Sequence, residues 1–213
     1  MYPQVVASGC SGLVTESRAL KDVEINAQFA YLCDPDLHAW NFCKQNGPPR
    51  CHYFRDLAIL AKTGQSYCFD HQQICQAVVP QGRSRLNSKV TGFGCQPFST
   101  SSKNRPSGTS THPEGMMWEN WIDELLRDQP DESLAENVFG LLNRESKDVA
   151  EAPIHKMLAS ATERAPMYSF MVFFVDQQNI LVLVRRRVYI HAMHSRVGGQ
   201  AAHSRMTNYV KVM

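Results

Sequence analysis

The stretch Val90-Thr91-Gly92-Phe93-Gly94-Cys95-Gln96-Pro97-Phe98-Ser99 places a cysteine in a tight turn after a short apolar run. The glycines at 92 and 94 allow backbone conformations in which a Cβ would clash, and Pro97 fixes its own φ. Cys95, presented in such a turn, is a candidate nucleophile. The alternative is a buried, unreactive cysteine beside an ordinary turn at the end of a strand. The other motifs of the chain decide between the two.

The composition narrows the classes of protein to which the chain can belong. The chain has 213 residues, enough for one large hydrophobic core, and its net charge of +2 neither requires nor excludes a nucleic acid partner. Seven cysteines, an odd number, without a charged and then apolar leader indicate reduced thiols in an intracellular compartment. The most apolar segment, 170–184, is interrupted by polar residues, so we expect no membrane span.

The start of the chain predicts a strand that turns into a helix. A β-rich run over 4–7 leads through Ser8-Gly9-Cys10-Ser11-Gly12 into a helical pattern over 15–20. At such a junction of a doubly wound α/β sheet, small residues let the backbone approach a nucleotide-like ligand. An ordinary turn is the alternative, because the strict G-x-G-x-x-G spacing is absent.

Two acids follow the next predicted strands. Asp34 comes after the β-rich run 28–33, about 20 residues beyond the glycine-rich turn, where this fold places an acid that bonds a ribose hydroxyl. Helix capping is the alternative role, and Asp36 could supply it equally. A third short strand is expected over 52–57, and it ends in the second acid, Asp56.

The stretch 61–85 is polar and is expected to be irregular. A zinc site is one interpretation of the cysteines and histidines in and before it, which are Cys51, His52, Cys68, His71 and Cys75. No paired Cys-x-x-Cys is present, so we predict instead an inserted surface loop over 60–85 and no bound metal.

The remaining patterns alternate between β-rich runs and helices. The run 85–93 predicts a fourth strand, and Cys95 follows its carboxyl end. The stretch 99–115 is rich in Ser, Thr, Gly and Pro, which is typical of a mobile lid or of a disordered insert. Further predictions are a helix over 118–127, a short strand running into a turn and helix over 131–142, a helix over 147–164, and a β-hairpin from 168–175 and 186–192.

Three ordered motifs resemble those of the cytosine-5 DNA methyltransferases. They are Gly94-Cys95-Gln96-Pro97-Phe98-Ser99, Glu136-Asn137-Val138 followed by Gly140-Leu141-Leu142, and Arg185-x-Arg187 entering a strand. The resemblance covers roughly residues 5–192, and it departs from the family at Gly94, where the family has proline. It implies an α/β, Rossmann-like fold that binds S-adenosylmethionine, with a mostly parallel sheet and a C-terminal antiparallel hairpin.

The resemblance also implies a reaction. The Cys95 thiolate adds to carbon 6 of cytosine, which makes carbon 5 able to accept a methyl group from S-adenosylmethionine. Glu136 bonds N3 and the exocyclic amine, Arg187 contacts O2 and holds Glu136, and Arg185 meets phosphate or the structure around the loop. The further substrate contacts implied are Gln96, Ser99 and Asn137, and the implied cofactor residues are Ser8, Gly9, Gly12, Asp34 and Asp56.

The organisation implied by the resemblance is a catalytic domain over 1–195, with a mobile catalytic loop over 99–115 and a tail over 196–213 that stops before a target-recognition domain. DNA is the expected partner, with the target base flipped out of the duplex. A tRNA is the alternative, because one branch of the family acts on RNA. Another alternative is a truncated, non-catalytic regulatory relative, and a partner subunit could supply the recognition domain. We expect a nuclear location in a eukaryote and a cytoplasmic one otherwise.

Overall fold

The computed structural model describes residues 3–49, 51–80, 85–95, 97–99, 116–143, 152–176, 186–201 and 204. The chain forms two units, which are Met1–Gly92 with Asp123–Ser133, and Phe93–Ile122 with Leu134–Met213. Helix α4, Met117–Asp128, and strand β7, Glu132–Val138, contribute residues to both units. None of the described helices is long and apolar enough to cross a membrane.

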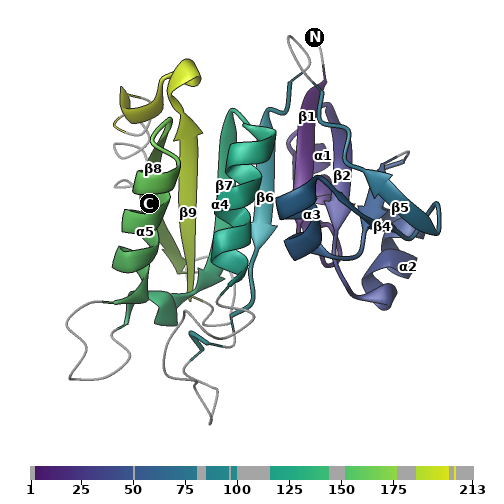
Figure 1. The fold of residues 1–213 in the computed structure, drawn as a ribbon. Coiled ribbons are helices and arrows are strands. Elements are labelled where there is room, and N and C mark those ends of the chain that lie inside the picture. Colours follow the sequence, from purple (N-terminus) through teal and green to yellow (C-terminus); the bar gives the residue numbers. More distant parts are fainter. Residues whose placement is uncertain are drawn as a thin grey trace. The chain divides into compact units, whose positions relative to one another are not determined.

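The first unit contains a sheet in the strand order β5-β4-β3-β2-β1-β6 (Figure 1). Strands β1, β2, β3 and β6 are parallel, whereas β4 and β5 are antiparallel additions at one edge. Its elements are β1 (Gln4–Gly9), α1 (Thr15–Asp22), β2 (Ala27–Cys33), α2 (Leu37–Asn46), β3 (His52–Phe54), α3 (Leu57–Thr63), β4 (Gln65–Cys68), β5 (Gln73–Gln76) and β6 (Ser88–Gly92).

The parallel strands end at one edge of this sheet. Gly9 pairs with Cys33 and with Thr91, and Cys33 pairs with Phe54, so four strand ends are level. In parallel α/β sheets, ligands bind beyond this carboxyl edge. The segments that the sequence analysis assigned to the cofactor follow these strand ends, and the expected α/β class is confirmed.

Tyr31 and Leu32 of β2 face opposite sides of the sheet, as successive residues of a strand do, and a register shift between Val6 and Ala7 of β1 interrupts the alternation between Phe29 and Tyr31. Leu32 joins an apolar core that also contains Val6 and Phe29, with Leu20 of α1 packed against it. Tyr31 faces the other side, where its hydroxyl contacts the carboxylate of Glu124 on α4. Helices therefore cover both faces of the sheet (Figure 1).

A fully buried cation joins the sheet to α4. The Lys89 Nζ on β6 lies 2.6 Å from Glu124 Oε1 and 3.6 Å from Asp128 Oδ2, and it donates to the hydroxyl of Tyr31. Burial raises the pKa of Glu124, whose Oε2 has no hydrogen-bond partner among the described residues. Burial also acts to raise the pKa of Asp128, but the charges of Lys89 and Arg127 outweigh it and hold that pKa below its ordinary value.

The expectation of an irregular chain over 61–85 is wrong for most of the described residues. Helix α3 continues to Thr63 and ends at Gly64, whose φ of 72° is a left-handed cap, and β4 and β5 then form a hairpin. The hairpin adds to the edge through backbone hydrogen bonds, so its polar side chains do not need the alternation that marks a half-buried strand. The strand expected over 52–57 is correspondingly shorter, because the carboxylate of Asp56 caps α3.

The second unit is built around strands in the order β7-β9-β8. The expected hairpin is confirmed, since β8 (Tyr168–Asp176) pairs antiparallel with β9 (Arg186–His194) along its full length. The other elements are the 3-10 turn η2 (Phe139–Leu142), α5 (Pro153–Arg164) and the 3-10 turn η4 (Ser195–Val197). The expected lid beyond Ser99, the start of the helix predicted over 147–164 and most of the tail lie outside the described residues.

We predict that Lys89→Met lowers the free energy of unfolding by about 3–5 kcal/mol, because it leaves two carboxylates buried without their cation. Urea denaturation measures this. The exposed Lys62→Met on α3 is the matched control and should change stability by less than about 0.5 kcal/mol. Equal effects of the two substitutions would contradict a structural role for the buried cation.

Candidate active site

Cys95 lies on a short, anchored turn that starts shortly after β6 ends. Its side chain is exposed, and its carbonyl oxygen accepts hydrogen bonds from the N–H groups of Phe98 at 3.0 Å and Ser99 at 2.8 Å. Phe93 and Phe98 are buried on either side of it, with their rings edge to face at 6.2 Å. The Phe93 ring also packs against Trp118. The buried position that the alternative expected for Cys95 is therefore wrong, whereas its role as a nucleophile stays a prediction.

Asn137 fixes the backbone that leads into Cys95. Its buried side chain donates through Nδ2 to the carbonyl oxygens of Phe93 at 3.1 Å and Gly94 at 3.4 Å, and its Oδ1 accepts from the N–H of Val138. The resemblance implied a substrate contact for Asn137. In the structure its amide bonds the backbone on both sides and so supports the cysteine turn, and the implied substrate contact stays a prediction.

Glu136 and Arg187 form an ion pair between two adjacent strands, β7 and β9. Arg187 Nε lies 2.6 Å from Glu136 Oε1, and the two side chains are 21% and 33% exposed, respectively. This is the contact between the two residues that the resemblance implied. Because Asn137 directly follows Glu136, one strand supplies both the acid and the amide that holds the cysteine turn.

Gly140 explains why the turn can lie so close to η2. A Cβ at this position would overlap the carbonyl oxygen of Phe98, and the contact is with backbone, which cannot rotate away. Any larger residue must displace the turn that carries Cys95. The Gly-Leu-Leu motif therefore has a direct steric role at the candidate site.

The glycine-rich loop of the first unit has an unusual backbone. Cys10, Gly12 and Val14 all have positive φ angles near 50°, which only glycine adopts readily. The hydroxyl of Ser11 ties the loop to β2, because it donates to the carbonyl of Cys33 at 3.2 Å and accepts from its N–H at 3.0 Å. Strained loops that the surrounding structure holds in place are concentrated at ligand sites.

The carboxylate of Asp34 is hydrogen-bonded to this loop. Its Oδ2 accepts from the N–H of Gly12 at 2.9 Å, and its Oδ1 accepts from the N–H of Asp36 at 2.9 Å. A carboxylate has about four lone-pair sites, so two remain for ribose hydroxyls. Asp36, rather than Asp34, caps α2 through the N–H of His38, and Asp56 caps α3 through the N–H of Ile59, a role that the sequence analysis did not predict for it.

Glu16 is a residue that the sequence analysis missed. It lies in the first turn of α1, directly after the glycine-rich loop, and contacts Ser8. Burial raises its pKa, and its Oε1 is buried without a hydrogen-bond partner among the described residues. An unpaired carboxylate oxygen beside the loop suits a ligand with a positive charge. The available signal was an acid one turn into the helix that follows the loop.

Several of the residues predicted for the active site and the cofactor site are not brought together by contacts among the described residues. Arg185, Gln96 and residues 100–115 lie outside the described part of the chain. A cavity of about 690 Å³ in the first unit is lined by Trp40, Asp70 and His71 among others, but by none of the five predicted cofactor residues.

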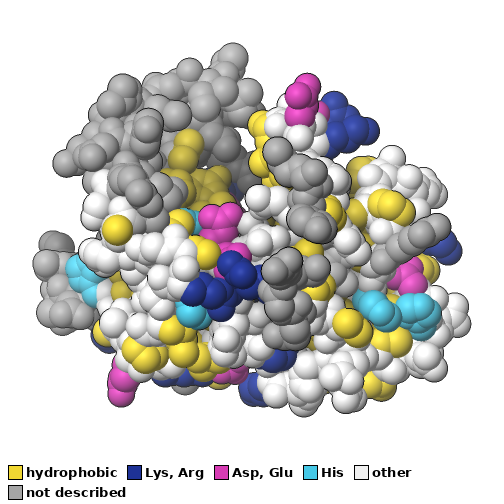
Figure 2. All heavy atoms as spheres, turned by 90° about the horizontal axis from the view of Figure 1, so that it is seen from above, with side chains coloured by type: hydrophobic (Ala, Val, Ile, Leu, Met, Phe, Trp, Pro, Cys, Tyr) yellow, Lys and Arg dark blue, Asp and Glu magenta, His cyan; other side chains and the backbone are white. Residues whose placement is uncertain are grey.

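Charge does not mark a nucleic acid surface on the face drawn in Figure 2. On the face drawn in Figure 2, lysine and arginine side chains lie in small groups beside acidic ones rather than in one broad basic field. This agrees with the net charge of +2. Long-range attraction of phosphate by the described residues is therefore expected to be weak.

We predict that Gly140→Ala destabilises the second unit by about 1–3 kcal/mol, the usual cost of an overpacked position. It should also increase the rate of hydrogen exchange at the Ser99 amide, next to the buried Phe98. Asn143→Ala, at the exposed end of η2, is the control and should leave both unchanged. Unchanged stability in Gly140→Ala would contradict the steric role.

Solved structures share this fold. The S. pombe Dnmt2 methyltransferase matches with a TM-score of 0.55 and 16% identity, over 91% of this chain and 50% of its own. A DNMT2 mutant from Spodoptera frugiperda matches with a TM-score of 0.57 and 14% identity, over 92% and 51%. A protein assigned as a DNA modification methyltransferase, encoded within a prophage (E. coli), matches with 0.55 and 17%, over 92% and 48%.

These matches establish the fold. The chain spans about half the length of each of the three proteins, and no family model and no curated protein matches its sequence. At such low identities a shared fold does not by itself carry an activity. The fold that the resemblance implied is confirmed, and the chain has the α/β fold of these methyltransferases.

Proposed function

We propose that this chain is the catalytic part of a cytosine-5 methyltransferase, which transfers a methyl group from S-adenosylmethionine to carbon 5 of cytosine in DNA through a covalent Cys95 adduct. The observation that carries the proposal is the arrangement in the second unit. The exposed thiol of Cys95 lies on a turn that Asn137 holds. The residue before Asn137 is Glu136, which forms an ion pair with Arg187.

Cys95 acts first in this scheme. Its thiolate adds to carbon 6, and the electron pair of the C5–C6 double bond moves into the ring toward N3 and O2. The thiol must lose its proton beforehand, and exposure to solvent provides the route. The anchored rings of Phe93 and Phe98 keep the turn in one conformation, which lowers the entropy cost of placing sulfur over the base.

Glu136 and Arg187 stabilise the charge that this addition creates. One oxygen of Glu136 accepts from the exocyclic amine, while the carboxyl group shares a proton with N3. Arg187 uses Nε for the ion pair and Nη1 for the carbonyl of Arg186, so guanidinium donors remain for O2 of the base. The ion pair keeps both groups oriented before the base arrives.

S-adenosylmethionine would supply an electrophilic methyl group for carbon 5. The residues of the first unit suit its parts. The strained Ser8–Gly12 loop lets backbone come close to the ligand, Asp34 has lone pairs for ribose hydroxyls, and Asp56 follows the next strand. The unpaired Oε1 of Glu16 would hold the α-ammonium group of the methionine moiety.

DNA is the proposed substrate, and tRNA is the alternative that the test must separate. Two of the matching structures are Dnmt2 proteins and the third is assigned to DNA modification. The chain spans about half of each, so these matches do not decide between the two polymers. The lid proposed over 99–115, with Arg185 and Gln96, completes the site around the flipped base.

The proposal predicts a trapped adduct. Incubation with S-adenosylmethionine and a single-stranded DNA containing 5-fluorocytosine should give a covalent complex, because fluorine at carbon 5 blocks release of the enzyme. Low ionic strength compensates for the weak basic surface. Denaturing electrophoresis and peptide mass spectrometry should locate the adduct at Cys95, and a parallel reaction with 5-fluorocytosine tRNA compares the two polymers.

Two controls make this decisive. Cys95→Ser should abolish the adduct, whereas Cys51→Ser, at a partly exposed cysteine whose thiol donates to the carbonyl of Pro48, should retain it. If only tRNA forms an adduct, tRNA rather than DNA is the substrate. If neither polymer is trapped and calorimetry shows no binding of S-adenosylmethionine, the proposal fails.

We also predict that Glu136→Gln and Arg187→Gln each slow adduct formation by about 10²–10³-fold, the usual cost of losing one charge-stabilising donor or acceptor at the reacting centre. Arg187→Lys should restore little, because an ammonium group cannot hold the carboxylate and O2 with fixed planar geometry. Quenched time courses with saturating oligonucleotide measure the rate. Wild-type rates in both glutamine variants would rule out these roles.

A further inference from the structure

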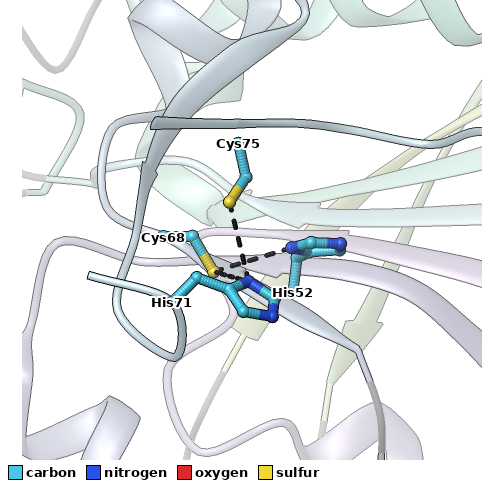
Figure 3. Close-up of side chains that lie close together, drawn as sticks. All are labelled: His52, Cys68, His71 and Cys75. Carbon is cyan, nitrogen blue, oxygen red and sulfur yellow. Dashed lines mark hydrogen bonds between the residues drawn. The ribbon is translucent and has the colours of Figure 1, made fainter. Parts of the chain in front are cut away.

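Four metal-binding side chains meet at the edge of the first unit, and none of them is among the residues proposed for catalysis and cofactor binding. They are His52 of β3, Cys68 at the end of β4, His71 in the hairpin turn, and Cys75 of β5 (Figure 3). One ligand atom from each residue lies within 4.8 Å of all the others. Nothing in the proposed methyl transfer uses these groups.

Strand pairing explains why residues far apart in sequence converge. Phe54 pairs with Cys68, and residues two apart on a strand share a face, so His52 lies on the same face as Cys68. In the hairpin, Cys68 pairs with Gln73, and Cys75 therefore lies on this face as well, two residues further along β5. The backbone alone brings three of the four ligands together.

The distances match those across a tetrahedral zinc ion. With Zn–S near 2.3 Å and Zn–N near 2.0–2.1 Å, a sulfur and a nitrogen ligand are separated by about 3.5–3.6 Å. The Cys68 sulfur lies 3.6 Å from His52 Nδ1 and 3.4 Å from His71 Nδ1, and the Cys75 sulfur lies 3.6 Å from His71 Nδ1. The other pairs of ligand atoms lie within 4.8 Å of one another.

The turn that carries His71 is fixed independently of any ion. Asp70 accepts hydrogen bonds from Trp40 Nε1 at 3.1 Å and from the N–H of Tyr53 at 3.2 Å. Gln72 has a φ of 54°, a strained value for a residue with a side chain, and its N–H donates to the carbonyl of Cys68 at 2.8 Å. Strain that is held in place by surrounding contacts is typical of a built site.

Thiol–imidazole hydrogen bonds are a weaker account of the cluster. Two sulfurs converge on the single Nδ1 atom of His71, and two imidazole nitrogens converge on the sulfur of Cys68. One Nδ1 carries either a proton or a lone pair, and a thiol has one proton, so these contacts compete. A shared cation satisfies all of them at once.

We propose that His52, Cys68, His71 and Cys75 bind one Zn²⁺ ion in a structural Cys₂His₂ site. Binding replaces two thiol protons, which are released to solvent, and leaves the site electrically neutral. All four positions are filled by protein, so no open position remains for chemistry, and the ion joins β3 to the β4–β5 hairpin. This site replaces the expectation of a metal-free surface loop over 60–85.

The test measures zinc in the full chain purified without chelators, by inductively coupled plasma mass spectrometry. Wild-type protein and the control Cys51→Ser should carry about one zinc per chain. His71→Asn and Cys75→Ser change residues that are exposed or partly exposed, so the fold should tolerate them. In both, the affinity measured against a chromophoric chelator should fall by more than about 10-fold.

Two further measurements strengthen the test. Cobalt(II) added to the metal-free protein should give the visible bands of a tetrahedral thiolate complex, and Cys75→Ser should weaken them. A chelator should lower the thermal midpoint of the wild type but not of Cys75→Ser. Zinc-free wild-type protein that does not bind added zinc, unchanged affinity in both variants, or a Cys68–Cys75 disulfide in freshly purified protein would overturn the proposal.

Discussion

The buried ion pair between Lys89 and Glu124 is the constraint on which the first unit depends. An unpaired ammonium group in the interior would cost several kcal/mol, so β6 can occupy its place only where α4 presents its carboxylates. Tyr31 completes the network from β2, which fixes two strands and one helix in a single register. Strand β6 ends at Gly92, and the segment that carries Cys95 begins the second unit at Phe93.

The second unit holds that thiol by contacts that do not involve its sulfur. Asn137 bonds the carbonyls before Cys95, the rings of Phe93 and Phe98 anchor both sides, and Gly140 leaves room for the Phe98 carbonyl. Within the described residues, Asn137 and Gly140 of the motifs that carry the resemblance therefore support the turn, and the side chain of Cys95 stays exposed. Holding groups in place before a substrate binds lowers the entropy cost of the reaction.

The sequence predicted the strand and helix order well, because parallel buried strands and their carboxyl ends leave strong patterns of apolar runs followed by small or acidic residues. It failed where tertiary pairing decides. The polar β4–β5 hairpin gives no alternation, and His52 reaches Cys68 only because β3 pairs with β4. Likewise, no local pattern indicates that the amide of Asn137 bonds the Phe93 and Gly94 carbonyls, and the substrate contact expected for Asn137 stays a prediction.

The most direct measurement of the central claim is the exchange of the hydrogen at carbon 5 of cytosine, followed in deuterium oxide without any methyl donor. Addition of the Cys95 thiolate to carbon 6 makes carbon 5 able to take up a deuteron, and reversal leaves the label in the base. The experiment depends only on the residues of the second unit. The account predicts exchange in an oligonucleotide with wild-type protein and none with Cys95→Ser. Absence of exchange with the wild type, or equal exchange with Cys95→Ser, would contradict it.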